Sequence, residues 1–255
     1  MGLNLTDGTE TCARVVTGLR EVGYVGLGQS LDYDDRTDTL VLSGLFGNGT
    51  TAGHAVFRSP ATGCGPFTRA GTYGDAEYIP MLHSSTLDAE GQRLFVLLAT
   101  VKNGPTTVGV VDLTRKMPMR TMAEGTPAPD DVLVGMHFDS ATQSLFGITA
   151  NQQAGGLVLH ALGVDGGKWA APKKIADVPP RWNALYGNEA TVSTFDAATR
   201  SMYFIAGTQD GQGNIVAEDL AAVNVDDATL VSHPKLSPVG LGGSGLQALA
   251  MAGSD

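Results

Sequence analysis

Apolar and polar positions follow one another in a pattern that occurs four times along the chain. In each copy an apolar residue precedes an aspartate, a short polar turn follows, and an apolar run begins six residues after the aspartate. The four aspartates are Asp34, Asp88, Asp139 and Asp196. Two apolar runs joined by a short polar turn predict a β-hairpin. The chain is therefore expected to be an array of similar β-structured repeats.

The aspartate of each hairpin is the first repeated mark in the sequence. A second repeated mark lies between the hairpins, where an apolar run ends in a polar residue before a small turn. The polar residues at this mark are Asp7, Ser59, Asp112, Asp165 and Asp226. Both marks return after about fifty residues, which is a repeat length typical of propellers and solenoids. Two independent marks with one period indicate a single kind of repeat along the whole chain.

A repeat of this length with four short strands resembles the blade of the β-propeller superfamily. The resemblance is carried by Phe195-Asp196, Met202-Tyr203 and Ser59-Pro60-Ala61-Thr62-Gly63. It implies a fold and no particular reaction. We expect an all-β, five-bladed β-propeller with four antiparallel strands in each blade, forming a single domain over residues 1–255.

The two marks also predict the bounds of the blades. We expect blades at about 27–75, 78–125, 130–179 and 187–236, and a closing blade made of 243–255 and 1–20. The inner strands are expected at Gln29–Tyr33, His83–Leu87, Gly135–Phe138, Thr191–Phe195 and Leu246–Leu249.

The closing blade, shared between the N- and C-termini, should lack one strand. The second strand of a blade has four copies in the sequence, whereas each of the other three strands has five. Three interpretations stay open. The closing blade has three strands, the chain is part of a longer protein, or another chain donates the missing strand.

Composition and charge limit the classes of partner. The formal net charge is −10 at pH 7 and no cluster of Lys and Arg is found, so neither nucleic acid nor a membrane is expected as a partner. No apolar run approaches the ~20 residues of a transmembrane helix, and the first residues have neither a basic nor an apolar segment, so no signal peptide is expected in the given chain. We expect a soluble monomer or a subunit of a larger assembly. Sequons at Asn4 and Asn48 are compatible with an extracellular location but leave the compartment undetermined.

The two cysteines are not expected to form a disulfide. Cys12 and Cys64 occupy equivalent places on neighbouring blades. Equivalent points this far from the axis should be roughly 15–20 Å apart, whereas a disulfide needs Cα atoms within ~7 Å.

The recurring aspartates have a structural and a functional interpretation. Asp32, Asp34, Asp35 and Asp38 have the spacing of calcium ligands. One aspartate at this point recurs in four blades, however, and its side chain can bond the backbone of the hairpin turn. We therefore expect turn chemistry, with no metal and no cofactor.

Candidate ligand-binding residues gather where the chain enters the inner strands, on the face that propellers commonly use for ligands. The candidates are Glu77, Tyr78, His83, Asp131, Arg181, Trp182, Asn183, Tyr186 and Glu189. The alternative for Trp182 is a structural one, in which its ring fills a gap between blades.

Three functions remain after the motifs are considered. The sequence has no metalloprotease, nucleophile-elbow, Walker or dinucleotide motif, so we expect a recognition module that binds a glycan, peptide or protein at the loop face. The first alternative is a propeller-type hydrolase or lyase that uses Glu77, Asp131 and Glu189 near the central axis. The second is a structural subunit of a larger assembly. Catalysis is the less favoured expectation.

Overall fold

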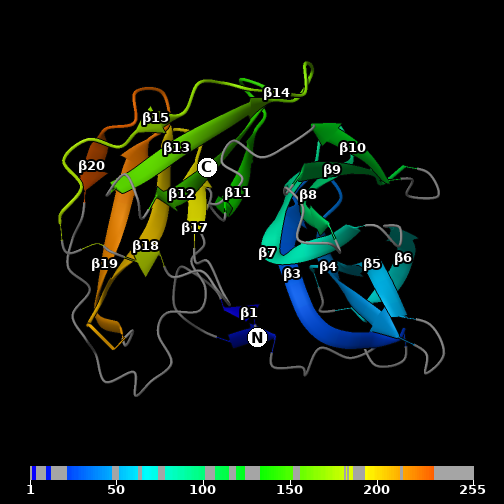
Figure 1. Ribbon diagram of the computed structural model, residues 1–255. Coiled ribbons are helices and arrows are strands. Elements are labelled where there is room, and N and C mark those ends of the chain that lie inside the picture. Colours follow the sequence, from blue (N-terminus) through cyan, green and yellow to red (C-terminus); the bar gives the residue numbers. More distant parts are fainter. Residues whose placement is uncertain are drawn as a thin grey trace. The chain divides into compact units, whose positions relative to one another are not determined.

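The computed structural model confirms an all-β chain. It describes residues 2–3, 10–12, 22–47, 52–62, 65–73, 78–100, 107–114, 119–123, 133–151, 156–180, 182, 184–185, 193–212 and 215–232. These residues form strands and turns, and none of them is helical (Figure 1). Accordingly, no helix that could cross a membrane occurs in this part of the chain.

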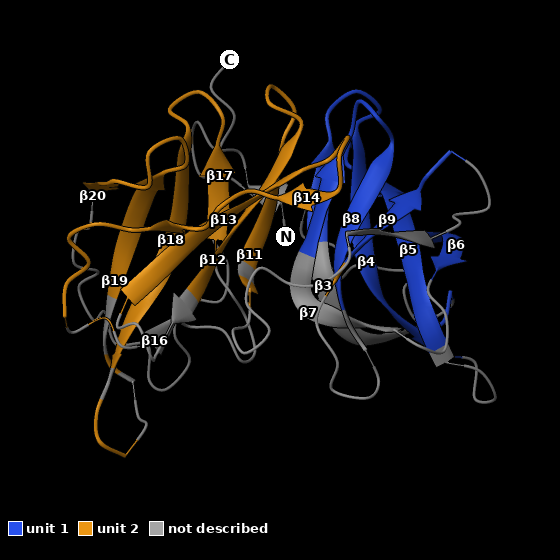
Figure 2. Cartoon of the chain, turned by 45° about the horizontal axis from the view of Figure 1, so that its top comes forward, with its two compact units in different colours: residues 1–104, 108–121 blue, residues 105–107, 122–255 orange. Residues whose placement is uncertain are grey.

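The chain divides into two compact units (Figure 2). Unit 1 comprises residues 1–104 and 108–121, and unit 2 comprises residues 105–107 and 122–255. Each unit contains two of the expected blades. The expectation of a single domain over residues 1–255 stays a prediction.

Unit 1 contains two four-stranded antiparallel sheets. The first consists of β3 (Tyr24–Asp34), β4 (Thr39–Gly47), β5 (Ala52–Pro60) and β6 (Thr68–Tyr73), paired in chain order. The second consists of β7 (Tyr78–Asp88), β8 (Arg93–Thr100), β9 (Thr107–Asp112) and β10 (Met119–Ala123), also in chain order. These are blades 1 and 2.

Unit 2 contains two sheets with additional short strands. Blade 3 consists of β11 (Leu133–Asp139), β12 (Ser144–Asn151), β13 (Gly156–Gly163), β14 (Lys168–Trp169) and β15 (Lys173–Lys174), and both β14 and β15 pair with β13. Blade 4 consists of β16 (Ala184–Leu185), β17 (Ser193–Asp196), β18 (Ser201–Gln209), β19 (Ile215–Asn224) and β20 (Leu230–Ser232), and both β16 and β17 pair with β18. The first strand of blade 4 is thus present as two pieces.

The expected number of five blades is wrong, because the described part of the chain forms four blade-type sheets. Near the N-terminus, β1 (Gly2–Leu3) and β2 (Glu10–Cys12) form a separate two-stranded sheet. The inner strand expected at Leu246–Leu249 lies outside the described residues. An apolar run indicates that a strand can form, but it does not indicate which strand it pairs with, so counting runs overestimated the number of complete sheets.

Apolar side chains fill the space between the two sheets of each unit. In unit 1, Val41 and Val56 of blade 1 pack with Leu94 and Val96 of blade 2. In unit 2, Ile148 of blade 3 belongs to the same cluster as the buried residues of β18 and β19. Residues 94–98 of β8 are all at most 1% exposed, so both faces of this strand are covered.

The recurring aspartate stabilises the turn between the first two strands of each blade, which confirms the turn interpretation. Asp34, Asp139 and Asp196 each accept a hydrogen bond from the backbone N–H two residues later, and Asp88 accepts one from the N–H of Gly91. Four residues after each aspartate the backbone has a positive φ, of 49° at Asp38, Gln92 and Gln143 and 56° at Arg200. The carbonyl of that residue then accepts a hydrogen bond from the chain just after the third strand. The positive φ and the bond to its carbonyl are therefore common to the turns of all four blades.

Candidate binding site on the inner strands

The predicted site residues fall mostly outside the described part of the chain. Glu77, Asp131, Arg181, Asn183, Tyr186 and Glu189 lie there. Tyr78 and His83 belong to β7, for which the backbone is described. Trp182 has a described side chain. The predicted set as a whole therefore stays a prediction.

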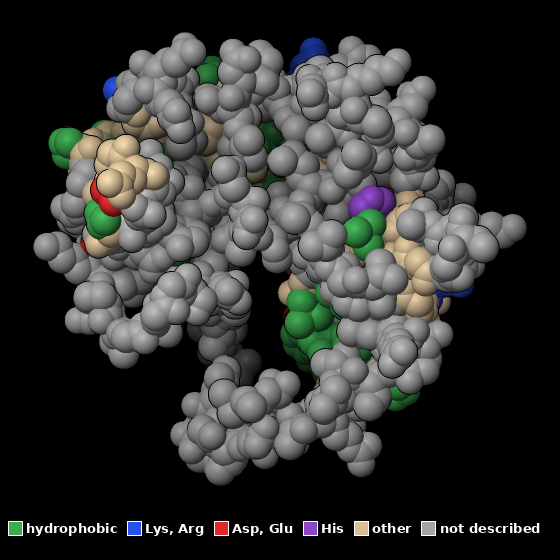
Figure 3. Space-filling view, turned by 60° about the horizontal axis from the view of Figure 1, so that its bottom comes forward, with side chains coloured by type: hydrophobic (Ala, Val, Ile, Leu, Met, Phe, Trp, Pro, Cys, Tyr) green, Lys and Arg blue, Asp and Glu red, His purple; other side chains and the backbone are tan. Residues whose placement is uncertain are grey.

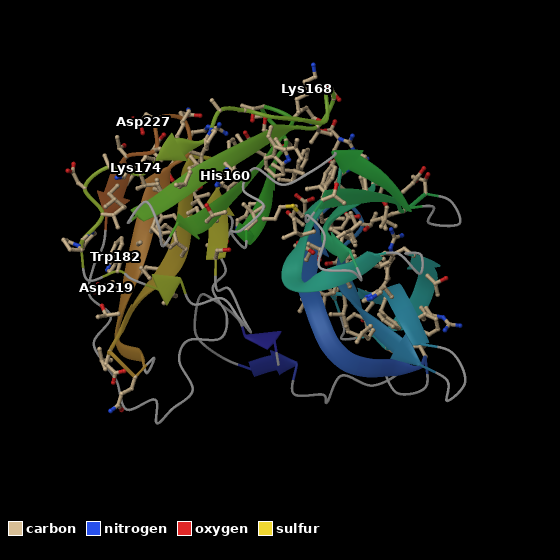
Figure 4. The ribbon with its side chains drawn as sticks, viewed as in Figure 1. His160, Lys168, Lys174, Trp182, Asp219 and Asp227 are labelled. Carbon is tan, nitrogen blue, oxygen red and sulfur yellow. The ribbon has the colours of Figure 1, made fainter. Side chains whose placement is uncertain are left out.

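Trp182 is an interior residue of unit 2. It is 5% exposed, and its Nε1–H donates a hydrogen bond to Asp219 Oδ2 at 2.5 Å (Figure 4). Its ring meets the Phe204 ring edge-on, with centroids 6.4 Å apart. These contacts support the structural alternative for Trp182, in which its ring fills the interior of the blade pair.

The inner strands share an irregularity that the sequence pattern did not reveal. In β3 the pairing with β4 shifts between Gly26 and Ser30, and in β7 the pairing with β8 shifts between Pro80 and Ser85. In β11 the shift lies between Val134 and His137.

Blade 4 has the largest version of this irregularity. Leu185 of β16 pairs with Ala206, whereas Ser193 of β17 pairs with Phe204. The pairing with β18 therefore stops at Leu185 and resumes at Ser193, while residues 186–192 lie outside the described residues. A bulge bends its strand, leaves backbone groups unpaired and redirects side chains. All four inner strands are therefore interrupted part-way along, shortly before the recurring aspartate.

The irregular segments contain part of the predicted site. His83 lies inside the shifted segment of β7, and the segment 186–192 contains the positions of Tyr186 and Glu189. Glycines such as Gly28 and Gly135 were the available sequence signal, because glycine is common at bulges. The chain has 34 glycines, however, so this signal selects no position.

Next to the bulge of blade 3, two polar side chains from neighbouring inner strands meet. His137 of β11 and Ser193 of β17 form a hydrogen bond of 2.8 Å between Nε2 and Oγ. Both residues are partly exposed. No local sequence pattern placed Ser193 in the site, because residues 56 positions apart become neighbours only through the packing of two blades.

Gly135 makes room for this pair. Its φ is +62°, and a Cβ at this position would lie 2.1 Å from Ser193 Oγ and 2.9 Å from Ser193 Cβ. Such distances exclude any side chain unless the strands shift. The bulge of β11 therefore brings the backbone of blade 3 directly against the Ser193 hydroxyl.

The His137 side chain is uncharged at neutral pH. Burial lowers its pKa to about 4, because the charged imidazolium would lose solvation at this position. A neutral imidazole can donate or accept a hydrogen bond, depending on its tautomer. As a general base it would be weak, since an efficient base has a pKa near the working pH.

Asp34 and Asp139, two of the aspartates of the hairpin turns, are held in the ionised form. Burial alone would raise the pKa of Asp139, but hydrogen bonds from Thr142 and Arg200 outweigh it and lower the pKa below its usual range. Burial and the amide of Gln92 act in the same opposing way on Asp34, and its pKa is also lowered. A general acid needs a raised pKa, so neither aspartate suits that role.

The described residues offer no cluster for a metal ion. No group of three or more His, Cys, Asp or Glu side chains is arranged there to hold one. Asp34 and Asp38 instead bind groups of the protein, namely the Arg36 backbone and the Gln92 amide for Asp34, and the Thr62 backbone and the Tyr33 hydroxyl for Asp38. Their oxygens are thus used by the turns.

No protein-family model matches the chain, and no curated protein sequence matches it either. Solved structures are similar to it at low sequence identity. One is the catalytic domain of the GH62 α-L-arabinofuranosidase of Coprinopsis cinerea, with 12% identity and a TM-score of 0.46 over 82% of this chain and 68% of that one. Another is the β-propeller domain of the Trilobed protease from Pyrococcus furiosus, with 7% identity and a TM-score of 0.42 over 85% and 57%.

A third similar structure is an oligogalacturonate lyase in complex with manganese, with 8% identity and a TM-score of 0.48 over 81% of this chain and 52% of that one. The chain thus spans little more than half the length of the protease domain and of the lyase. These proteins have hydrolase and lyase activities, but identities this low carry no activity to this chain. The repeated sheets place it in the all-β propeller fold class, and the described residues form four blades.

Proposed function

We propose that the protein is a recognition module that binds a glycan, peptide or protein with the interrupted parts of its inner strands and the loops that lead into them. The observation that supports this most is that the pairing of the inner strand shifts at a similar level in blades 1, 2 and 3, and that in blade 4 it breaks between Leu185 and Ser193. Four repeated interruptions are costly for a sheet, because each one removes ladder hydrogen bonds. Bulges at such positions commonly orient side chains toward a ligand.

Charge supports the same proposal. Asp34, Asp139 and Asp196 of the hairpin turns are engaged by the scaffold and are held ionised. Among the described side chains visible in Figure 3, hydrophobic ones are more prominent than charged ones. Uncharged polar and apolar groups suit the binding of a neutral ligand better than acid–base catalysis.

A hydrolase or lyase remains the alternative, through Glu77, Asp131 and Glu189. Two carboxylates on either side of a scissile bond would be required, one of them with a raised pKa. A structural subunit is the second alternative. Neither has a specific observation among the described residues in its favour.

Binding to arrays of immobilised glycans and peptides would test the proposal. We expect the purified protein to bind at least one ligand class, and His83→Ala, within the β7 bulge, to weaken that binding at least tenfold. Thr68→Ala is the control. Thr68 is exposed on β6, which is the edge strand of blade 1 opposite the inner strand β3, so this variant should leave binding unchanged.

Catalytic turnover of an oligosaccharide would favour the alternative function, a hydrolase or lyase. If the protein cleaves oligosaccharides in the same panel, and if Glu77→Gln or Glu189→Gln abolishes cleavage while ligand binding persists, the hydrolase or lyase function replaces the proposed one. If neither binding nor cleavage occurs, the recognition function is wrong.

A further inference from the structure

Two polar side chains on neighbouring inner strands of unit 2 define a more specific site. We propose that His137 and Ser193 together form an uncharged hydrogen-bonding site for a hydroxyl group of the ligand, and that the ligand is a neutral glycan. This inference rests on the proposed recognition function and names its ligand class.

The geometry of the pair suits a hydroxyl group. Nε2 of His137 and Oγ of Ser193 are 2.8 Å apart, so one hydrogen bond is already made. If Ser193 donates that bond, its oxygen still has lone pairs to accept from a ligand. If His137 donates it, the Ser193 O–H is available to donate. A ligand hydroxyl both donates and accepts, so it can match the pair in either tautomer.

The accessibility of the pair agrees with such a role. Both residues are half-buried, and they lie between the two sheets of unit 2. Gly135, which has no side chain, lets the two strands approach closely enough for the His137–Ser193 bond to form.

Charge favours a neutral glycan over an acidic one. The imidazole of His137 is uncharged at neutral pH, so it gives no ionic attraction to a carboxylate. Asp139, two residues further along the strand, is already neutralised by Arg200. The protein as a whole carries a net charge of −10, which repels uronates and sulfated sugars.

A purely structural role is the competing explanation, and unit 1 offers a matched control for it. Ser85 and Ser193 both lie three residues before the recurring aspartate of the second blade in their unit. Ser85 is 7% exposed, whereas Ser193 is more accessible. Ser85→Ala therefore reports the loss of an equivalent hydroxyl that a ligand cannot easily reach.

The experiment compares neutral oligosaccharides with uronic-acid-containing ones on a glycan array, followed by titration calorimetry on the strongest neutral binder. We expect neutral oligosaccharides to bind. Ser193→Ala and His137→Phe should raise the Kd at least tenfold, and Ser85→Ala should leave it within about twofold. His137→Gln, whose neutral amide can also donate and accept, should retain more affinity than His137→Phe.

The outcomes separate the two levels of the proposal. Binding of peptides or acidic glycans without neutral ones overturns the ligand class and leaves the recognition function in place. Binding of neutral glycans with an unchanged Kd in Ser193→Ala overturns the site. An absence of any binding overturns both. Thermal unfolding of each variant must keep the native transition, and His137→Gln provides the folded comparison if His137→Phe does not fold.

Discussion

Trp182 owes its position to one polar and one apolar contact. Its N–H bonds the Asp219 carboxylate, and its ring packs in the largely apolar interior of unit 2, against Phe204. Because the ring is nearly fully buried, truncation would leave a large cavity. Trp182→Ala is expected to reduce the free energy of unfolding by about 3–5 kcal/mol.

Urea denaturation followed by circular dichroism would measure this loss. Trp182→Phe, which keeps most of the ring volume and loses the N–H donor, should be clearly less destabilised than the alanine variant. A native-like stability of Trp182→Ala, combined with lost ligand binding, would instead restore Trp182 to the predicted binding site.

Gly135 is required by both its backbone conformation and its neighbour. A residue other than glycine at φ +62° costs about 1–2 kcal/mol, and an added Cβ would also overlap Ser193 Oγ. We expect Gly135→Ala to lower stability by more than about 2 kcal/mol, again measured by urea denaturation. Gly163→Ala is the control, since a Cβ there meets no atom within 4 Å. Equal effects of the two substitutions would contradict the close packing of blade 3 against Ser193.

His137 should make the protein less stable in mild acid. Its pKa is about 4 in the folded protein and about 6.5 in an unfolded chain, so between these values only the unfolded chain binds the proton. Stability due to the neutral imidazole is therefore present above pH 6.5 and is lost as the pH falls toward 4, by at most about 3 kcal/mol.

Denaturation of the wild type and of His137→Gln at several pH values between 7 and 4 would check this. The variant should lose less stability than the wild type over that range. Part of the decline should remain in the variant, because burial also lowers the pKa of His54. Asp139 and Arg200 lie nearby, but the lowered pKa of Asp139 moves its own titration below this range. Parallel curves for the two proteins would refute the assignment to His137.

The hairpin turn is the element that links one blade to the next. In the second blade of each unit, the side chain of the positive-φ residue donates a hydrogen bond to the recurring aspartate of the preceding blade. Gln92 donates to Asp34 at 3.0 Å, and Arg200 donates to Asp139. Arg200 also bonds Asp226 at 2.8 Å, at the end of the third strand of its own blade. The turn thus positions a side chain that holds two sheets together.

Removal of the arginine should therefore be costly. The Asp139 side chain is fully buried, and Arg200→Gln would remove its positive partner while leaving the bonds from Ala141 and Thr142. We expect a loss of about 2 kcal/mol in the free energy of unfolding. Asp226→Asn is the control, because the Asp226 side chain is 58% exposed and its ion pair should contribute less than about 1 kcal/mol. A larger effect of Asp226→Asn than of Arg200→Gln would disprove the link between blades 3 and 4.

At the scale of the whole molecule, the two tryptophans give unit 2 its own spectroscopic signal. Trp169 and Trp182 are the only tryptophans in the sequence, and both belong to unit 2. Far-ultraviolet circular dichroism, in contrast, reports the strands of both units. If the chain is one domain, as its uniform repeat predicts, fluorescence and dichroism should follow a single unfolding transition.

Two separated transitions in urea would contradict the single domain. Fluorescence would then follow only one of the two steps, and the units would be independent folding units. The circular dichroism spectrum of the native protein should in either case be that of a β-protein. The coincidence of the two probes, rather than the spectrum, is the decisive measurement.

The sequence by itself determined the repeat, the hairpins and the role of the recurring aspartates. These features depend on residues close together in the chain, such as Asp196 and the N–H of Ala198, so local physical chemistry is sufficient to predict them. The pattern also located four of the inner strands correctly, apart from Thr191 and Val192 at the start of the fourth, which lie outside the described residues.

Only the tertiary structure decided the number of complete sheets, the bulges and the pairing of His137 with Ser193. Apolar periodicity tells which face of a strand is buried, but it contains no information on which distant segment completes a sheet or where a pairing shifts. The surroundings of Trp182 were undetermined for the same reason, since Asp219 lies 37 residues away. Contacts between blades are made by residues more than fifty positions apart, and their choice is set by packing rather than by local sequence.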